Sequence, residues 1–325
     1  MCTAVSITAG DNYFGRNLDL EHTFGEKVVI TPRNFPFTFS NGKTIKNHYA
    51  IIGMAVIAEN YPLYFDATNE KGLSLAGLNF PANAFYNEPK ETKENVASYE
   101  FITWILSQCK NLNEAKELLL KINITGKAFA DNFAPTPLHF IISDKDGSVT
   151  FEQTKDGAKV FKNPISILTN NPTFDIHMAN LSNYMSLSPC DPKNTFTDKT
   201  DLKIYSKGMG AIGLPGDCSS MSRFVRAAFV ASNSDFSGKE TQKVCQFFHV
   251  LKSVEHQKGC IRTADGFEIT NYSSCTNASR GIYYYTTYYN SCITGVDMHR
   301  ENLDSDKLIS YDLLKQEKLF IQNEV

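Results

Sequence analysis

The stretch that decides the fold of this chain is its first twenty residues, Met1-Cys2-Thr3-Ala4-Val5-Ser6-Ile7-Thr8-Ala9-Gly10 and Asp11-Asn12-Tyr13-Phe14-Gly15-Arg16-Asn17-Leu18-Asp19-Leu20. Apolar and polar residues alternate over 4–8, which predicts a strand. Residues 9–12 are typical of a turn, and residues 13–17 predict the returning strand. Such a hairpin brings Arg16 and Asp19 back toward Cys2.

Cys2 is a candidate nucleophile because a small second residue permits removal of Met1, which leaves its thiol and a free α-amine on one residue. The ordinary pKa values of these groups, ~8.5 and ~8, let them act as nucleophile and base near neutral pH. A cation at Arg16 would favour the thiolate, and a carboxylate at Asp19 could hold the ammonium or take its proton. The alternative is that Arg16 and Asp19 are ordinary surface residues of an edge hairpin.

Composition limits the classes of function. The 325 residues carry 32 basic and 35 acidic side chains, a net charge of −3, so no nucleic-acid partner is indicated. There is no leader pattern and no apolar run that could span a bilayer, so we expect a cytoplasmic protein, without membrane insertion and without a propeptide before Cys2. The eight cysteines lack a Cys-x-x-Cys pair and the seven histidines lack a His-Glu-x-x-His array, which predicts reduced thiols and no metal. Because no repeat or linker divides the chain, we expect one domain over residues 1–325.

The rest of the chain predicts many strands interrupted by helices, an α+β layer architecture. Strands are predicted over residues 28–31, 49–58, 64–67, 73–79, 139–144, 149–153, 158–161, 165–169, 267–274, 282–289 and 293–298. Two helices are predicted between residues 98 and 123, with Asn113 as a cap, and others over 219–231 and 241–256. Gly259 is expected to end the last helix, on which His249 and His256 are expected to be core or surface residues.

Three features outside the hairpin suggest a site, although each has a simpler interpretation. Asn79 ends a strand of small residues, so its backbone N–H could face a site, and Asn170 ends another strand before Asn171-Pro172. Asparagine at a strand end is more often only a turn former. Phe129 and Phe133 are large apolar residues in a loop, so they either plug the core or line a pocket.

Several blocks occur together, in a fixed order, from Met1 to about Tyr311. They are Met1-Cys2-Thr3, Phe14-Gly15-Arg16-Asn17-Leu18-Asp19, Asn69-Glu70-Lys71-Gly72-Leu73, Ala76-Gly77-Leu78-Asn79-Phe80, Leu168-Thr169-Asn170-Asn171-Pro172, Gly213-Leu214-Pro215-Gly216-Asp217 and Ser222-Arg223-Phe224. Together they resemble the choloylglycine hydrolase family of bile salt hydrolases and penicillin V acylases, which belongs to the N-terminal-nucleophile hydrolases. The resemblance implies a four-layer αββα sandwich, a homotetramer and catalysis without a cofactor.

The resemblance also implies roles for six catalytic residues at the matching positions: Cys2, Arg16, Asp19, Asn79, Asn170 and Arg223. The Cys2 sulfur attacks an amide carbonyl and its α-amine passes the proton to the leaving nitrogen. The backbone N–H of Asn79 and the side-chain amide of Asn170 stabilise the oxyanion. Asp19 orients the amine, while Arg16 and Arg223 favour the thiolate and hold the carboxylate network in place.

The substrate pocket implied by the resemblance is lined by Leu18, Phe65, Phe129, Phe133 and Leu138. Conjugated bile salts are the leading substrates, since penicillin V acylases often have Tyr where this chain has Asn79. Penicillin V and acyl transfer to another amine are the alternatives. A carrier of amphipathic ligands is disfavoured because a carrier has no use for Cys2. The triplet Ser206-Lys207-Gly208 favours glycine over taurine conjugates, with Lys207 facing the anionic end.

Overall fold

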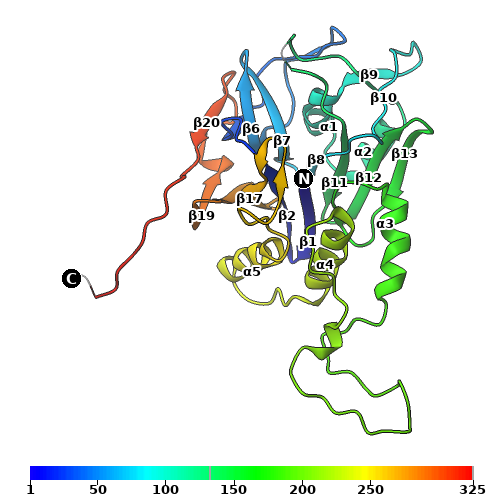
Figure 1. Cartoon of the computed structure of the whole chain (residues 1–325). Helices are drawn as coiled ribbons and strands as arrows, with labels where there is room; N and C mark the ends of the chain where they lie inside the picture. Colours follow the sequence, from blue (N-terminus) through cyan, green and yellow to red (C-terminus); the bar gives the residue numbers. More distant parts are fainter. Residues whose placement is uncertain (132, 324–325) are drawn as a thin grey trace.

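Two antiparallel sheets stacked face to face form the centre of the molecule in the computed structural model, which describes residues 1–131 and 133–323 (Figure 1). The six-stranded sheet has the order β14 (Ile167–Leu168), β1 (Cys2–Ala9), β2 (Asp11–Leu20), β17 (Ile269–Asn277), β18 (Ile282–Thr287) and β19 (Asn290–Asp297). The eight-stranded sheet has the order β13 (Gly157–Lys162), β12 (Gly147–Thr154), β11 (Leu138–Asp144), β8 (Ser74–Asn79), β7 (Tyr61–Asn69), β6 (Ile51–Ala58), β3 (Lys27–Thr31) and β20 (Ile309–Asp312).

Helices cover the outer face of each sheet, so the chain forms the predicted four-layer αββα sandwich (Figure 1). The five α-helices are α1 (Phe101–Gln108), α2 (Leu112–Leu119), α3 (Phe174–Leu181), α4 (Ser220–Asn233) and α5 (Glu240–Lys252). Helices α1 and α2 lie on the eight-stranded sheet, whereas α4 and α5 lie on the six-stranded sheet and α3 packs beside α4.

Alternating side chains of the eight-stranded sheet divide the apolar interior into two parts. On β11, Phe140 and Ile142 face the layer of α1 and α2, while Ile141 faces the six-stranded sheet. The core between the sheets continues to the apolar faces of α4 and α5. Strands buried on both faces hold their register firmly because a slip of one residue would exchange the two faces.

Shorter elements complete the fold. The paired strands are β4 (Phe37–Thr38) with β5 (Thr44–Ile45), β9 (Glu94–Ala97) with β10 (Ile122–Thr125), and β15 (Arg262–Thr263) with β16 (Gly266–Phe267). The 3₁₀ turns are η1 (Ser98–Glu100), η2 (Ser182–Tyr184), η3 (Met209–Ala211) and η4 (Met298–Arg300). In the described part of the chain, no helix combines the length and the apolar character needed to cross a membrane.

The N-terminal hairpin is confirmed, with Cys2 opposite Leu18 and Ala9 opposite Asp11. Gly15 is required in it because β17 lies very close. A Cβ added there would lie 1.9 Å from the carbonyl oxygen of Ser274. The close approach lets β17 follow β2 along its whole length, and β17 contributes several side chains to the site described below.

Three local expectations were wrong, and one strand of the large sheet was missed. The cap of α2 is Asn111 instead of Asn113, since Asn111 is extended and its Oδ1 accepts the N–H of Glu114 at 3.0 Å. Helix α5 ends at Lys252 instead of near Gly259. The prediction ran too far because the buried side chain of Val254 continues the apolar spacing of the helix after the chain has turned. The strand predicted over 165–169 is only β14, since Ser166 has a φ of 58°. Strand β20 was not predicted and pairs with β3.

Candidate active site

The first residue of β1, Cys2, is buried at the edge where β1 meets β14, with 3% of its surface exposed. Ala4 lies opposite Leu168 in this antiparallel pair, so the chain two residues beyond Leu168 reaches Cys2. There the backbone N–H of Cys2 donates to Oδ1 of Asn170 at 2.8 Å. The short pairing of β14 thereby brings the candidate nucleophile and a candidate oxyanion donor together.

Arg223, from the first turns of α4, links the same two residues. Its Nη2 donates to Oδ1 of Asn170 at 2.8 Å and its Nη1 to the carbonyl oxygen of Cys2 at 2.5 Å. The guanidinium is completely buried, and burial lowers its pKa despite the attraction of nearby anions. Because an arginine side chain stays protonated in proteins, Arg223 supplies a fixed positive charge behind the nucleophile.

These contacts fix the orientation of the Asn170 amide. Its Oδ1 faces two donors, so its Nδ2 lies on the opposite side, where it donates to the carbonyl oxygen of Asn79 at 2.7 Å. Asn170 follows β14 and Asn79 ends β8, so one residue from each large sheet meets at this point. The backbone N–H of Asn170 donates to Ser220 Oγ at 2.8 Å, which fixes the residue further.

The amino terminus lies in a group of buried acidic side chains. The Met1 ammonium donates to the Asp19 carbonyl oxygen and to Oε2 of Glu268, the latter at 2.8 Å. Oε1 of Glu268 lies 2.8 Å from Nδ1 of His256, which is also 3.8 Å from Oδ2 of Asp19. Burial acts to raise the pKa of Glu268, but His256 and the ammonium outweigh it and lower that pKa below its ordinary value. The carboxylate is thus kept ionised beside the terminus.

The carboxylate of Asp19 is held from β17. Thr270 Oγ1 donates to its Oδ1 at 2.6 Å, whereas its Oδ2 has no hydrogen-bond partner among the described residues. Asp19 is completely buried, so the open oxygen is available to a cation inside the protein only. The α-ammonium that Cys2 would carry after loss of Met1 is such a cation.

Arg16 connects the hairpin with the second sheet. Its Nη1 donates to the carbonyl oxygens of Phe65, at 3.0 Å, and of Gly77, at 2.5 Å. Burial alone would lower the pKa of Arg16, but attraction to the Cys2 thiolate and to nearby acidic side chains raises it above its ordinary value. A buried cation near a thiol is the arrangement that the sequence predicted for Arg16.

Asp66 is a buried acidic side chain that interacts electrostatically with Arg16, and sequence reasoning missed it. Burial raises the pKa of Asp66, although Arg16 and three hydroxyl donors oppose that rise. Tyr272 donates to Oδ1 at 2.6 Å, and Tyr283 and Ser274 donate to Oδ2 at 2.8 and 3.0 Å. An Asp inside a predicted strand, with its partners 200 residues away in the chain, gives no local signal.

Glu268 and His256 were missed as well. His256 was expected on a helix, as a core or surface residue, yet it follows the end of α5 and is buried next to the terminus. Glu268 lies just before β17, outside every block of the family resemblance. A signal for either would have required knowing that β17 pairs with β2.

The five apolar residues predicted to bind substrate fall into three groups. Leu18 lies opposite Cys2, and Leu138 lies opposite Asn79, so both flank the site, while Phe65 is partly buried beside the core between the sheets. Phe129 packs on the rings of Tyr61 and Tyr99, with Phe133 next to it and 45% exposed; the ring centroids of Phe129 and Phe133 are 5.8 Å apart.

Lys207 stands apart from these residues. It belongs to the segment between α3 and α4, which extends away from the sheets (Figure 1). Its side chain is 96% exposed and its Nζ lies 3.7 Å from Oδ2 of Asp191. The structure therefore does not bring Lys207 together with the residues around Cys2.

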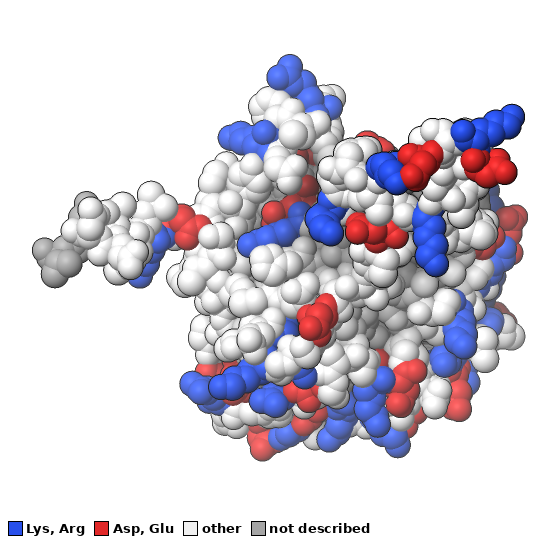
Figure 2. Space-filling model, turned by 90° about the horizontal axis from the view of Figure 1, so that it is seen from below, with Lys and Arg blue, Asp and Glu red and all other residues white. Residues whose placement is uncertain are grey.

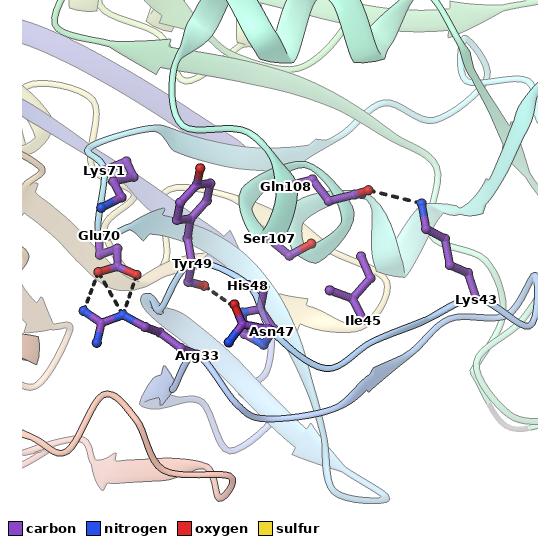
Figure 3. Close-up of a pocket in the computed structure, with 10 residues that line it drawn as sticks. All are labelled: Arg33, Lys43, Ile45, Asn47, His48, Tyr49, Glu70, Lys71, Ser107 and Gln108. Atoms are coloured by element: carbon purple, nitrogen blue, oxygen red, sulfur yellow. Dashed lines mark hydrogen bonds and ion pairs between the residues drawn. The ribbon is translucent and has the colours of Figure 1, made fainter.

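A separate cavity of about 660 Å³ lies where the turn after β7 meets the end of α1 (Figure 3). It is lined by Arg33, Lys43, Ile45, Asn47, His48, Tyr49, Glu70, Lys71, Ser107 and Gln108. Its charged groups are largely paired within the wall: Arg33 Nη2 lies 2.6 Å from Glu70 Oε2, and Lys43 Nζ donates to Gln108 at 3.2 Å. The candidate catalytic residues are not among those that line it.

The described residues include no group of three or more His, Cys, Asp or Glu side chains placed to hold a metal ion. All eight cysteines are described, and each is a free thiol. The side chains gathered around Cys2 are a buried thiol, two buried guanidinium groups, a carboxylate and a pair of asparagines. This set can activate a thiol and stabilise an oxyanion.

Comparisons with known proteins agree with this chemistry. Residues 2–311 match the model of the family described as linear amide C–N hydrolases, choloylglycine hydrolase family. A relative named bile salt hydrolase/transferase, from Lactiplantibacillus plantarum, is 47% identical over 99% of this chain and 100% of its own length. The crystal structure of the C2A mutant of conjugated bile acid hydrolase from Clostridium perfringens is similar with a TM-score of 0.92, at 38% identity over 99% of this chain and 100% of that one. Penicillin V acylase from Agrobacterium tumefaciens shares the fold, with a TM-score of 0.76 at 19% identity over 96% and 91% of the two chains.

Proposed function

This chain belongs to the choloylglycine hydrolase family of linear amide C–N hydrolases, and we propose that it hydrolyses the amide bond of glycine- or taurine-conjugated bile salts. The observation that carries this proposal is the convergence of Cys2, Asn170, Asn79 and Arg223 at one buried point, in a chain 47% identical to a bile salt hydrolase/transferase. The products would be the free bile acid and the amino acid.

In the proposed mechanism, removal of Met1 gives Cys2 a basic α-amine. The thiol proton moves to this amine as the sulfur forms a bond to the carbonyl carbon and the carbonyl electron pair moves onto oxygen. The backbone N–H of Asn79 and the Nδ2 group of Asn170 stabilise that oxyanion. Collapse breaks the C–N bond, and the α-ammonium gives its proton to the leaving nitrogen.

The thioester is then hydrolysed by water, which loses a proton to the same amine and adds its oxygen to the acyl carbon. A second collapse releases the bile acid and restores the thiol. Asp19 and Glu268 hold the α-ammonium that forms in each half of the cycle, and Arg16 with Arg223 stabilises the thiolate. The chain's own groups supply every step, so the proposal needs no cofactor.

Penicillin V hydrolysis and acyl transfer are the alternative activities. Transfer differs only in that an amine replaces water at the thioester, and several relatives carry transferase in their names. The test is to incubate the purified protein with glycocholate, taurocholate and penicillin V, with and without added amino acids, and to measure released amine and new conjugates. Release of amine from penicillin V alone would contradict the proposal, and new conjugates would add the transferase activity.

Selectivity between glycine and taurine conjugates is proposed to depend weakly on Lys207. An exposed pair between a lysine and a carboxylate or sulfonate has a small free energy and is screened by salt. We expect wild type to favour glycocholate severalfold in kcat/KM, and Lys207→Ala or high salt to reduce that ratio. A wild-type ratio that favours taurocholate, or a ratio that neither Lys207→Ala nor high salt changes, would show that Lys207 does not set this selectivity.

The acyl group is proposed to bind by apolar burial on Phe133 and Phe129. Removing one aromatic ring costs on the order of 1–3 kcal/mol of buried apolar contact. We expect Phe133→Ala to lower kcat/KM for both bile salts by that amount with little change in Tm, because its ring is 45% exposed. Phe129→Ala should lower both kcat/KM and Tm, since its ring also packs on Tyr61 and Tyr99. Phe320→Ala, 86% exposed near the C-terminus, is the control. A lower Tm with an unchanged kcat/KM would assign both rings to the core.

We also infer that the protein is a cytoplasmic homotetramer. Each subunit is a single domain over residues 1–325, from which Met1 is expected to be removed. Support comes from exposed apolar residues on the segment between α3 and α4: Met185, Phe196 and Tyr205 are each more than 80% exposed. Exposed apolar groups of this kind often mark interfaces between subunits. The view from below also shows an uncharged area surrounded by charges of both signs (Figure 2). Gel filtration of a cytoplasmic extract tests both proposals, and elution as a monomer would contradict the tetramer.

A further inference from the structure

A buried histidine and a buried glutamate lie directly behind the two asparagines. His139, on β11, is 0% exposed and Glu152, on the neighbouring β12, is 1% exposed. Nδ1 of His139 lies 3.0 Å from Oε1 of Glu152, and its Nε2 lies 2.7 Å from the carbonyl oxygen of Thr169. Thr169 is the residue before Asn170.

Both ring nitrogens of His139 form hydrogen bonds to oxygen atoms. A carbonyl oxygen can only accept, so Nε2 of His139 carries the hydrogen of its contact with Thr169, and Nδ1 shares a hydrogen with Oε1 of Glu152. Oε1 of Glu152 also accepts the N–H of Phe174, the first residue of α3, at 3.0 Å. Each member of the pair therefore bonds both its partner and a backbone group of a neighbouring segment, Thr169 for His139 and Phe174 for Glu152.

The imidazole also contacts the segment of Asn79. The ring of Phe80 stacks on it, with the centroids 4.1 Å apart and the planes 6° from parallel. Phe80 directly follows Asn79, and its backbone N–H donates to the carbonyl oxygen of Pro137 at 2.8 Å. One face of His139 thus fixes the residue after Asn79, while its Nε2 edge fixes the residue before Asn170.

A third contact ties α3 to the same point. His177, on α3, lies with its Nε2 2.9 Å from the carbonyl oxygen of Asn170. Because Glu152 binds the start of α3 through Phe174, the carboxylate also sets where His177 can reach. The neighbours of both asparagines therefore depend on the His139–Glu152 pair.

We propose that the His139–Glu152 pair positions the oxyanion hole from behind, holding the Asn170 amide and the Asn79 backbone N–H at the spacing that a tetrahedral intermediate requires. His139 is a positioning residue, since its ring nitrogens bond Glu152 and the carbonyl oxygen of Thr169 instead of Cys2 or either asparagine. The inference rests on the proposed function for its kinetic part. A displacement of about 1 Å in a catalytic group can cost on the order of a hundredfold in rate, so a second layer of this kind is expected to affect kcat.

The experiment compares four variants by kcat and KM for glycocholate and by Tm. His139→Phe keeps a ring for Phe80 but has no N–H, so we expect kcat to fall about tenfold or more with KM nearly unchanged. His139→Gln keeps a donor near the position of Nε2 and should recover part of kcat. His139→Phe leaves the buried carboxyl group of Glu152 without its partner. His139→Phe/Glu152→Leu is therefore the alternative if the single variant does not fold. His48→Phe is the matched control. The His48 ring also bonds two carbonyl oxygens, at 2.7 and 2.8 Å, but it lines the separate cavity of about 660 Å³ instead of the site at Cys2.

Two further measurements separate positioning from general stability. In His139→Phe combined with Asn170→Ala, kcat should fall by less than the product of the two single losses, because both changes act on one hole. Crystal structures of wild type and His139→Phe should show the 2.7 Å contact from Asn170 Nδ2 to Asn79 O lengthened in the variant only. A variant with lowered Tm, an intact contact and wild-type kcat would overturn the inference. The structural comparison decides it even if wild type fails to cleave bile salts, an outcome that would count against the proposed function alone.

Discussion

Cys2→Ala is expected to abolish turnover of glycocholate and taurocholate without loss of folded protein. The side chain is buried at the end of β1, and the contacts that hold its backbone, to Asn170 and Arg223, do not involve sulfur. Removing the sulfur therefore deletes the nucleophile and leaves the fold in place. Cys2→Ser should be severely impaired, because a hydroxyl is a much weaker acid than a thiol. Cys245→Ser, on the exposed side of α5, is the matched control and should retain activity.

Retention of Met1 should have the same effect as loss of the thiol. While Met1 is attached, the nitrogen of Cys2 is an amide that donates its hydrogen to Asn170, so it cannot accept the thiol proton. Protein made while methionine removal is inhibited should be heavier by one methionine and inactive. Intact mass and activity measured on the same sample decide this, and wild-type turnover by protein that still carries Met1 would disprove the mechanism.

Asn170→Ala is expected to lower kcat by roughly a hundredfold or more while KM changes less, because the lost donor acts mainly in the transition state. The change also removes the acceptor of the Cys2 N–H and of Arg223 Nη2, which adds to the loss. Asn79→Ala should be milder, since its donor belongs to the backbone.

The matched control is Asn69→Ala. Asn69 is also completely buried, and its amide donates to the carbonyl oxygens of Leu106 and Cys109 at 2.9 and 2.8 Å, away from the oxyanion hole. This control should lower Tm and keep kcat. If Asn170→Ala instead raises KM and leaves kcat unchanged, Asn170 binds substrate and is no part of the oxyanion hole.

Local pattern predicted much of the fold because the sheets are built from hairpins whose partners are neighbours in sequence. The pairing of β1 with β2, and of β11 with β12, follows from alternation and turn residues. Local pattern could not predict where helix α5 stops, because buried Val254 continues the apolar period past Lys252. It also could not predict the pairing of β2 with β17, which joins segments about 250 residues apart in the chain.

The candidate site divides in the same way. The six residues named by resemblance are brought near one another by the hairpin, β8, β14 and α4, but their roles stay predictions until the variants are measured. The groups around them, Asp66, His256, Glu268 and the His139–Glu152 pair, have no motif. Each is a buried ionisable side chain that reaches the site only through the tertiary packing of segments, which a single sequence does not reveal.

The half-buried amino terminus has a practical consequence for anyone who handles this protein. Any peptide fused ahead of Cys2 would have to leave through the space where Met1 contacts Asp19 and Glu268, so an amino-terminal affinity tag would disable the enzyme it was meant to purify. The other end of the chain offers a better handle: it runs outward from the body after β20, and Leu319 and Phe320 are more than 80% exposed (Figure 1). Tags, dyes and tethers to a solid support therefore belong on the carboxyl side.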